Sequence, residues 1–306
     1  MQTALGANGQ IAEELTRELH RNVTHDIRLV SRHPRAVHET DELVSADLRD
    51  TRATADAVAG SDVVYLTVGL PMDSAMWQEQ FPVMMGNVIA ACRQHHCRLV
   101  FFDNTYMYPR TAAPQTEQTP FEPVGPKARV RAHITTMLLD QMGAGNLEAL
   151  ICRAPEFYGP GRTQSLTNSM VFGRIAKGRR PMVPVSAHTR RTLIWTPDAS
   201  RAMALLGNTP DAYAQTWHLP CDPDRLTYRG MIAVASAAVG RRIGYTTVPT
   251  LAFRIGGLLN PTVREVEELL PRYRQDNIFD SSKFMSRFPD FPVTSYRQGI
   301  QQLVEG

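Results

Sequence analysis

The 306-residue sequence predicts an α/β fold built around a doubly wound parallel sheet. Short apolar runs alternate with amphipathic segments through the first half of the chain, which is the order of βαβ units. Two of these runs, residues 63–68 and 98–102, are almost continuously apolar, as is typical of strands that helices cover on both faces. A glycine-containing turn joins the first run to the first amphipathic segment. These three observations favour a Rossmann-type fold.

The individual elements follow from the same alternation of apolar and amphipathic segments. Strands are expected at residues 3–5, 27–31, 44–46, 63–68, 98–102 and 147–152. Helices are expected at residues 10–21, 51–58, 81–95 and 127–142. A loop rich in Pro and Thr, residues 109–126, precedes the last of these helices. Two later strand-like segments, residues 191–196 and 216–219, are expected to return to the sheet.

Composition excludes several classes of protein. The 33 basic and 30 acidic residues give a net charge of +3 and form no concentrated Lys/Arg stripe, so nucleic acid is not an expected partner. No segment approaches the roughly 18 to 20 apolar residues that span a bilayer. The N-terminus also lacks the basic-then-apolar layout of a secretion signal. We therefore expect a cytoplasmic protein with no membrane partner.

Cysteine usage indicates neither a disulfide framework nor a metal centre. The four cysteines are too few for a chain of this length, and we expect reduced thiols. Two of them, Cys92 and Cys97, flank His95 and His96, and all four are residue types that bind zinc. This cluster lies where a helical pattern runs directly into an apolar strand, so we expect no metal.

The turn Gly6-Ala-Asn-Gly9-Gln-Ile-Ala12 predicts a dinucleotide site because it leaves the first strand and opens the first helix. Gly6 supplies a tight turn, Gly9 lets a pyrophosphate approach the backbone, and Ala12 allows close packing of helix and strand. The start of the helix offers N–H groups and a positive dipole to phosphate. The other expected cofactor contacts in this turn are Asn8, Gln10 and Ile11. The alternative is that both glycines only shape the turn.

The end of the second strand indicates which nicotinamide cofactor binds. An acidic residue there pairs with the ribose hydroxyls of NAD, whereas an arginine accommodates the additional phosphate of NADP. The sequence is Leu29-Val-Ser31-Arg32-His33, which contains no acid. Arg32 offers a planar fork to a phosphate and Ser31 a hydroxyl donor. We therefore expect NADP(H) in preference to NAD(H), the alternative being that Arg32 is a solvated loop residue.

The chain is expected to divide into a cofactor domain and a smaller C-terminal substrate lobe. From Arg153 onward the composition shifts toward Gly, Pro and short irregular elements. We expect residues 1–155 to form the NADP(H)-binding Rossmann domain, with returning segments near 191–219, and residues 156–306 to form mainly the substrate-binding lobe.

Several segments together resemble the NAD-dependent epimerase/dehydratase family, the extended or atypical short-chain dehydrogenases/reductases. They are Gly6 to Ala12, Ala46 to Asp50, Val63 to Gly69, Phe102 to Pro109, Arg153 to Gly161 and Thr196 to Ala202. The resemblance covers nearly the whole chain. It implies an oxidoreductase with additional cofactor contacts at Asp47 and Leu48 (adenine), Thr67, Val68 and Gly69 (ribose and pyrophosphate), and Pro155 to Tyr158 (nicotinamide).

The catalytic signature departs from the family pattern. Members usually carry a Tyr-x-x-x-Lys pair, whose spacing places both side chains on one helix face so that the ammonium lowers the pKa of the phenol. Lys127 stands at the lysine position, where the resemblance implies a cofactor-ribose contact, but the residue four earlier is Pro123. Proline cannot exchange a proton, so the acid must come from elsewhere.

The replacement is expected near the end of the fifth strand. The family's serine or threonine position falls on Asn104, with Thr105 beside it, and either side chain can polarise a carbonyl. Tyr106 is the first choice for the proton donor because ligands of open α/β sheets bind outside the carboxyl ends of the strands. The alternative for Tyr106 is a packed or substrate-stacking aromatic, whereas Tyr108 is expected to pack. Glu156 is either a general base or a turn-capping carboxylate.

These observations support a leading function and alternatives to it. The first is an NADP(H)-dependent oxidoreductase or epimerase acting at a carbinol or carbonyl carbon of a small molecule or nucleotide sugar. The second, motivated by Pro123, is a non-catalytic or regulatory NADP(H)-binding protein, and a third is a lyase or isomerase without net redox change. Two basic pairs, Arg179-Arg180 and Arg190-Arg191, are expected to be solvated or to meet an anionic substrate. The expected partners are a small-molecule substrate and, as in related proteins, a second copy in a homodimer.

Overall fold

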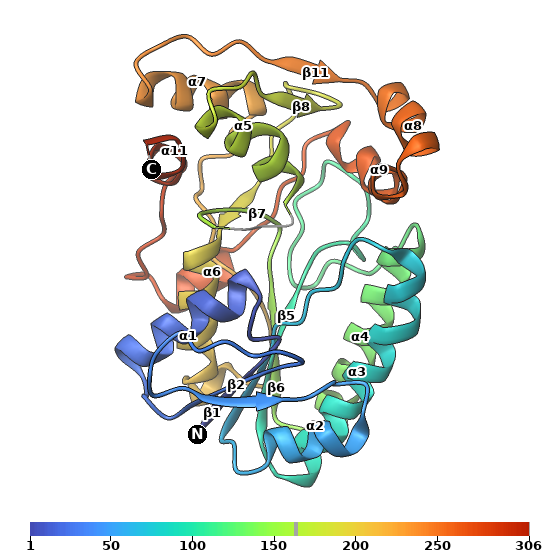
Figure 1. Cartoon of the computed structure of the whole chain (residues 1–306), viewed down its shortest axis with the longest axis vertical. Coiled ribbons are helices and arrows are strands. Elements are labelled where there is room, and N and C mark those ends of the chain that lie inside the picture. Colours follow the sequence, from blue (N-terminus) through green and yellow to red (C-terminus); the bar gives the residue numbers. More distant parts are fainter. Residues whose placement is uncertain (162–164, 306) are drawn as a thin grey trace. The chain divides into compact units, whose positions relative to one another are not determined.

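The computed structural model describes residues 1–161 and 165–305 (Figure 1). The chain forms two compact units that interleave along the sequence. Unit 1 comprises Met1–Met107, Pro123–Ala154 and Ala199–Leu219. Unit 2 comprises Tyr108–Glu122, Pro155–Asp198 and the chain from Pro220 onward. Part of the Pro- and Thr-rich loop lies in unit 2, and so do residues 191–198.

Unit 1 is built on a seven-stranded sheet in the order β10-β6-β5-β4-β1-β2-β3, and all its pairs are parallel. The strands are β1 (Gln2–Leu5), β2 (Ile27–Ser31), β3 (Glu42–Ser45), β4 (Val63–Leu66), β5 (Arg98–Asp103), β6 (Ala149–Arg153) and β10 (Thr216–His218). The order reverses at β1 and β4, as in a doubly wound Rossmann sheet. The predicted fold class is confirmed.

Helices cover both faces of this sheet. The set on one face is α2 (Thr51–Val58), α3 (Ser74–Gln94) and α4 (Pro126–Gly143) (Figure 1). The set on the other face is α1 (Gln10–Asn22) and α6 (Thr196–Gly207), joined by a hydrogen bond from Ser200 Oγ to the Ile11 carbonyl. The core of unit 1 lies between the sheet and α2–α4, where Val64, Val88 and Leu99 are fully buried.

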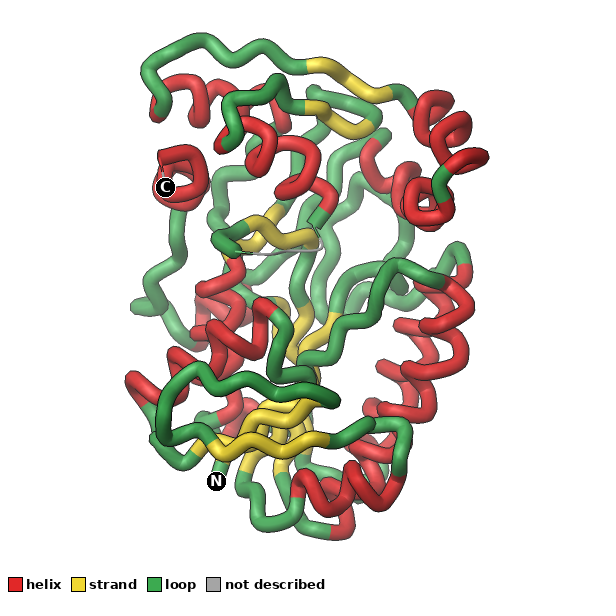
Figure 2. The backbone as a smooth tube through the Cα atoms, in the orientation of Figure 1, coloured by secondary structure: helices red, strands yellow, loops and turns green. Residues whose placement is uncertain are grey.

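Unit 2 consists mostly of loops and short helices around two small parallel sheets (Figure 2). The sheets pair β7 (Glu156–Tyr158) with β9 (Leu193–Trp195), and β8 (Met182–Pro184) with β11 (Thr246–Val248). The α-helices are α5 (Gly173–Ala176), α7 (Tyr228–Ala238), α8 (Thr250–Leu259), α9 (Pro261–Val266), α10 (Ser282–Arg287) and α11 (Tyr296–Glu305). Helical turns of other types are η1 (Asn168–Phe172, a π-helix), η2 (Pro210–Ala212, a 3-10 helix in unit 1) and η3 (Glu267–Tyr273, a 3-10 helix). A separate aromatic core holds this unit together.

Two expected elements are placed differently by the structure. Helix α3 begins at Ser74 rather than near residue 81, because the Asp73 side chain accepts the N–H of Met76 and caps an additional two turns. The segment 191–196 does not return to the main sheet, since β9 pairs with β7 inside unit 2. The other returning segment is confirmed, because β10 pairs with β6. Within the described residues, no helix combines the length and apolarity needed to cross a membrane.

Candidate active site

The turn after β1 requires glycine at its first position. Gly6 has a φ of +95°, and a Cβ atom there would lie 2.9 Å from the Cα of Val68. The N–H groups of Gly6 and Ala7 both donate to the Val30 carbonyl, which fixes the turn against β2. Conformation and space therefore both exclude a side chain at this point.

The N-terminus of α1 is open to a phosphate in a way that the starts of α2 and α3 are not. The N-caps of α2 and α3 are Asp50 and Asp73, whose carboxylates accept backbone N–H groups of their own helices. The N-cap of α1 is Gly9, and no side chain caps this helix. The first-turn N–H groups, including those of Gln10 and Ile11, point to where an anion would complete the helix. This arrangement fits the pyrophosphate of a dinucleotide.

Arg32 is held beside this turn by its backbone. Asn8 Nδ2 donates to the His33 carbonyl at 2.7 Å, and Ser45 Oγ donates to the Arg32 carbonyl at 2.9 Å. The Ser31 hydroxyl accepts the His33 N–H at 3.2 Å. The Arg32 side chain is exposed and forms no ion pair with the described residues. Its guanidinium is thus available at the carboxyl end of β2.

The remaining predicted contacts of unit 1 lie on adjacent loops. Hydrogen bonds from Arg49 hold the pKa of Asp47 at about 2, so this carboxylate is ionised and its negative charge is paired with the Arg49 guanidinium. The Leu48 side chain is buried, and its carbonyl accepts Asn87 Nδ2 at 2.9 Å. Thr67 donates both its N–H and its hydroxyl to the Leu5 carbonyl. These two bonds hold the start of the loop that carries Val68 and Gly69, and Val68 lies beside Gly6. Cofactor contact at these positions stays a prediction.

A buried cluster of charged residues lies at the carboxyl end of β5, and the sequence analysis did not predict it. The Asp103 carboxylate accepts Arg131 Nη2 at 2.6 Å, Thr135 Oγ1 at 2.9 Å and Arg153 Nη2 at 3.2 Å. Asp103 is fully buried, and both arginine side chains are at most 6% exposed. Its Oδ1 also accepts the N–H of Asn104 at 2.8 Å. The cluster therefore anchors the loop that leaves β5.

That loop positions Tyr106. Asn104 Oδ1 accepts the Tyr106 N–H at 3.0 Å, so the side-chain amide oxygen of Asn104 shapes the turn, and contact of Asn104 with a substrate stays a prediction. Thr105 is buried. The Tyr106 ring stacks on Trp77 with centroids 6.1 Å apart and an interplanar angle of 8°. Trp77 is itself fixed by a 2.7 Å hydrogen bond from Nε1 to the Pro71 carbonyl.

Lys127 reaches the same turn of α3 from the start of α4. Its side chain is 1% exposed, and Nζ donates to Ser74 Oγ at 2.8 Å. Ser74 and Trp77 are three residues apart on α3 and share one helix face. Lys127 and Tyr106 therefore both contact the first turn of α3. This juxtaposition depends on α3 beginning at Ser74, which was not predicted, although Asp73 followed by Ser74 is a helix-start signal.

The other tyrosines considered for proton transfer are packing residues. Tyr108 is fully buried, as expected. The Tyr158 ring lies in unit 2 among Phe172, Trp195 and Tyr296, with centroids 5.1–5.7 Å away. Burial also raises the pKa of the Tyr158 phenol well above its usual value. Of Tyr106, Tyr108 and Tyr158, only Tyr106 is half-buried rather than buried. Contacts of Pro155 and Tyr158 with a nicotinamide stay predictions.

Glu156 is a structural carboxylate of unit 2. Its Oε1 accepts the N–H and hydroxyl of Thr167 at 2.9 and 2.6 Å. Its Oε2 accepts the Tyr273 hydroxyl at 3.0 Å and Arg191 Nη2 at 3.3 Å. Both carboxylate oxygens therefore accept hydrogen bonds within the fold, which favours the turn-capping interpretation over the general base.

The thiols and histidines form no metal centre in the described parts of the chain. Cys92, Cys97, Cys152 and Cys221 are buried and unbridged, and burial raises the pKa of each. No group of three His, Cys, Asp or Glu residues there is arranged to hold an ion.

Comparison with known proteins extends this description. The model of the NAD dependent epimerase/dehydratase family matches residues 4–218. An uncharacterised protein of Sinorhizobium fredii, y4nL, is 24% identical over 286 residues, covering 86% of this chain and 79% of that protein. UDP-glucuronic acid 4-epimerase of Bacillus cereus in complex with NAD has a similar structure, with a TM-score of 0.79, 12% identity, and coverage of 100% of this chain and 99% of the other. The structure of a dTDP-glucose 4,6-dehydratase double mutant of Streptomyces venezuelae is also similar, with a TM-score of 0.79 and 15% identity. The match covers 100% of this chain and 96% of the other.

Proposed function

Because the chain belongs to the NAD dependent epimerase/dehydratase family, we propose that it is an NADP(H)-dependent enzyme that acts at a carbinol or carbonyl carbon of a nucleotide sugar. Family membership confirms the predictions of an enzyme and of a nicotinamide cofactor. The proposal adds the choice of NADP(H), the substrate class and an active site in which Tyr106 replaces the usual tyrosine. The observation that carries it is the attachment of both Tyr106 and Lys127 to the first turn of α3.

The glycine turn and Arg32 are assigned to the cofactor. The uncapped N-terminus of α1 holds the pyrophosphate, and Gly6 keeps the turn close to Val68. Arg32 and Ser31 bind the ribose phosphate that distinguishes NADP(H). When bound, the nicotinamide supplies the hydride acceptor or donor for the reacting carbon.

The protein's own residues move the proton. The Tyr106 hydroxyl exchanges a proton with the substrate oxygen as hydride leaves or reaches the carbon. To Lys127, whose Nζ is bonded to Ser74 on the same turn of α3, we assign the stabilisation of the ionised phenol by a positive charge. Trp77 holds the ring, and the Asp103 cluster holds the loop that carries it.

The substrate class comes from the similar structures. Two of them are named as enzymes of UDP-glucuronic acid and dTDP-glucose. Both compounds join a six-carbon sugar to a nucleoside diphosphate. This supports a nucleotide sugar over a small carbonyl compound.

Arg32→Ala is expected to weaken NADPH binding by roughly 10- to 150-fold while NADH affinity changes by less than about threefold, because one charge-assisted contact is worth about 1.5–3 kcal/mol. Isothermal titration calorimetry with each cofactor measures both values. Arg52→Ala, at an arginine whose side chain is 93% exposed on α2, is the control for loss of one positive charge. Unchanged NADPH affinity in Arg32→Ala contradicts the preference for NADP(H).

Incubation with nucleotide sugars tests the reaction itself. With NADP⁺ present, we expect conversion of UDP-glucuronic acid, dTDP-glucose or a related nucleotide hexose to an epimer or a dehydrated sugar, detected by liquid chromatography and mass spectrometry. The control is the same incubation with NAD⁺, which should be slower. Pro123 at the usual tyrosine position favours a second candidate, a non-catalytic NADP(H)-binding protein. Tight NADPH binding without turnover of any nucleotide sugar or simple carbonyl compound supports that candidate instead.

A further inference from the structure

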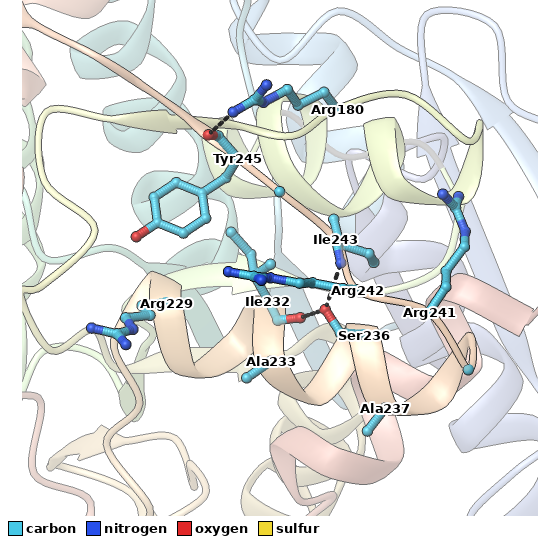
Figure 3. A pocket seen from close by; sticks show the side chains of 12 residues that line it. Arg180, Arg229, Ile232, Ala233, Ser236, Ala237, Arg241, Arg242, Ile243 and Tyr245 are labelled. Atoms are coloured by element: carbon cyan, nitrogen blue, oxygen red, sulfur yellow. Dashed lines mark hydrogen bonds between the residues drawn. The ribbon is translucent and has the colours of Figure 1, made fainter.

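Unit 2 contains an open pocket of about 710 Å³ whose walls carry four arginines (Figure 3). Arg229 lies in the first turn of α7, Arg241 and Arg242 follow its C-terminus, and Arg180 comes from the loop before β8. Figure 3 shows Arg242 extending along α7 toward the end of the pocket where Arg229 and the ring of Tyr245 lie. Three separate segments thus bring positive charge to one hollow.

The charge of these segments is not balanced locally. Residues 225–264 contain six arginines and no aspartate or glutamate. Residues 173–197 contain six arginines and lysines, also without an acidic residue. The basic residues of the chain are therefore less evenly distributed than their total suggests, and the lining of the pocket includes no carboxylate.

The four guanidinium groups also have no acidic partner elsewhere. All four side chains are exposed, and none forms an ion pair within the described residues. The negative end of the α7 dipole accounts for Arg241 and Arg242, which follow the C-terminus of that helix. It does not account for Arg229, which lies at the positive end, or for Arg180. Like charges gathered in this way repel one another unless an anion lies between them.

The pocket wall is held in place by hydrogen bonds that leave most guanidinium donors unused. Arg180 Nη2 donates to the Tyr245 carbonyl at 2.8 Å, which ties the loop before β8 to the segment entering β11. The Ser236 hydroxyl donates to the Ile232 carbonyl at 2.7 Å and accepts the Ile243 N–H at 3.1 Å, which folds the Arg-bearing loop back onto α7. An anion would therefore meet donors on a fixed frame.

We propose that this pocket binds a small anion carrying two or more phosphate groups. Guanidinium forks match phosphate oxygens in bidentate geometry, and four of them exceed what a single phosphate group can compensate. A volume of about 710 Å³ lies within the range of small-molecule sites. The site differs from the dinucleotide turn in unit 1 and shares no lining residue with the buried Glu156–Arg191 cluster. It provides a second phosphate-binding site outside the catalytic machinery.

Inorganic pyrophosphate is the probe for this site. Calorimetric titration of the full-length protein at low ionic strength is expected to show saturable binding that weakens as salt is added. Arg229→Gln and Arg242→Gln are each expected to reduce affinity about tenfold or more, and the double variant about 100-fold or more. Arg254→Gln, which removes an exposed arginine of α8 outside the pocket, is the matched control and should change affinity less than twofold. Circular dichroism checks that each variant remains folded.

Titration with and without saturating NADPH separates the two phosphate sites. Pyrophosphate affinity that is independent of NADPH supports the pocket in unit 2, whereas loss of binding in the presence of NADPH assigns it to the glycine turn and overturns the proposal. Equal weakening in Arg254→Gln and Arg242→Gln also overturns it, since the effect is then one of general charge. Saturable binding of a single-stranded RNA without binding of pyrophosphate overturns the proposal as well.

Discussion

Tyr106→Phe is expected to lower turnover of the nucleotide sugar by about 10²- to 10⁴-fold, the usual contribution of a general acid or base. The substitution removes one hydroxyl and retains the ring, so the stacking on Trp77 and the turn made by Asn104 are preserved. Cofactor affinity should therefore change by less than about twofold. Steady-state kinetics give the first value, and calorimetric titration with NADPH gives the second.

Tyr108→Phe is the matched control, because it removes a phenol two residues away whose side chain is fully buried. Its turnover should stay within about threefold of the wild-type value. The pH profile adds a second readout: loss of the Tyr106 hydroxyl should remove one limb of the dependence of turnover on pH, whereas a merely packed ring leaves both limbs. Unchanged turnover in Tyr106→Phe assigns the proton transfer to another group.

The part of the fold that was predictable depends on local patterns. Strands such as β4 and β5 are apolar throughout because helices cover both faces, and the glycine turn is recognisable because Gly6 adopts a backbone conformation that other residues avoid. The partner of β9 was not predictable in this way. A three-residue apolar strand carries no information on which of two sheets it joins, and its pairing with β7 is decided by packing in unit 2.

The residues of the candidate site also divide into those that local sequence patterns identify and those that only tertiary contacts bring together. Lys127 and Tyr106 were identified from their places after a strand and at a helix start, but their common support on α3 depends on contacts across 53 residues of sequence for Lys127 and Ser74. The Asp103 cluster is likewise assembled from residues 28 and 50 positions away. Sequence periodicity reports burial within one element and does not report which buried charges meet. An arginine that ends the apolar strand Ala-Leu-Ile-Cys-Arg153 was the available signal.

Asp103→Asn is expected to lower the free energy of unfolding by about 3–5 kcal/mol, because it leaves two buried guanidinium groups without their carboxylate. Urea denaturation followed by circular dichroism measures the loss. Asp62→Asn is the control: that carboxylate pairs with the N-terminal amine, its side chain is 71% exposed, and the expected loss is at most about 1 kcal/mol.

The same substitution tests whether the cluster positions the active site. In Asp103→Asn the loop loses the charged acceptor of the Asn104 N–H, so Tyr106 is held less firmly and turnover should fall even at temperatures where the variant is folded. Thr135→Val removes the hydrogen bond that a neutral hydroxyl donates to the same carboxylate and leaves both ion pairs, so it should lose about 1–3 kcal/mol with little change in turnover. If Asp103→Asn and Thr135→Val lose equal stability, hydrogen bonding rather than charge holds the cluster together. If Asp103→Asn is destabilised but keeps full turnover, the cluster supports the fold and Tyr106 is positioned by Trp77 alone.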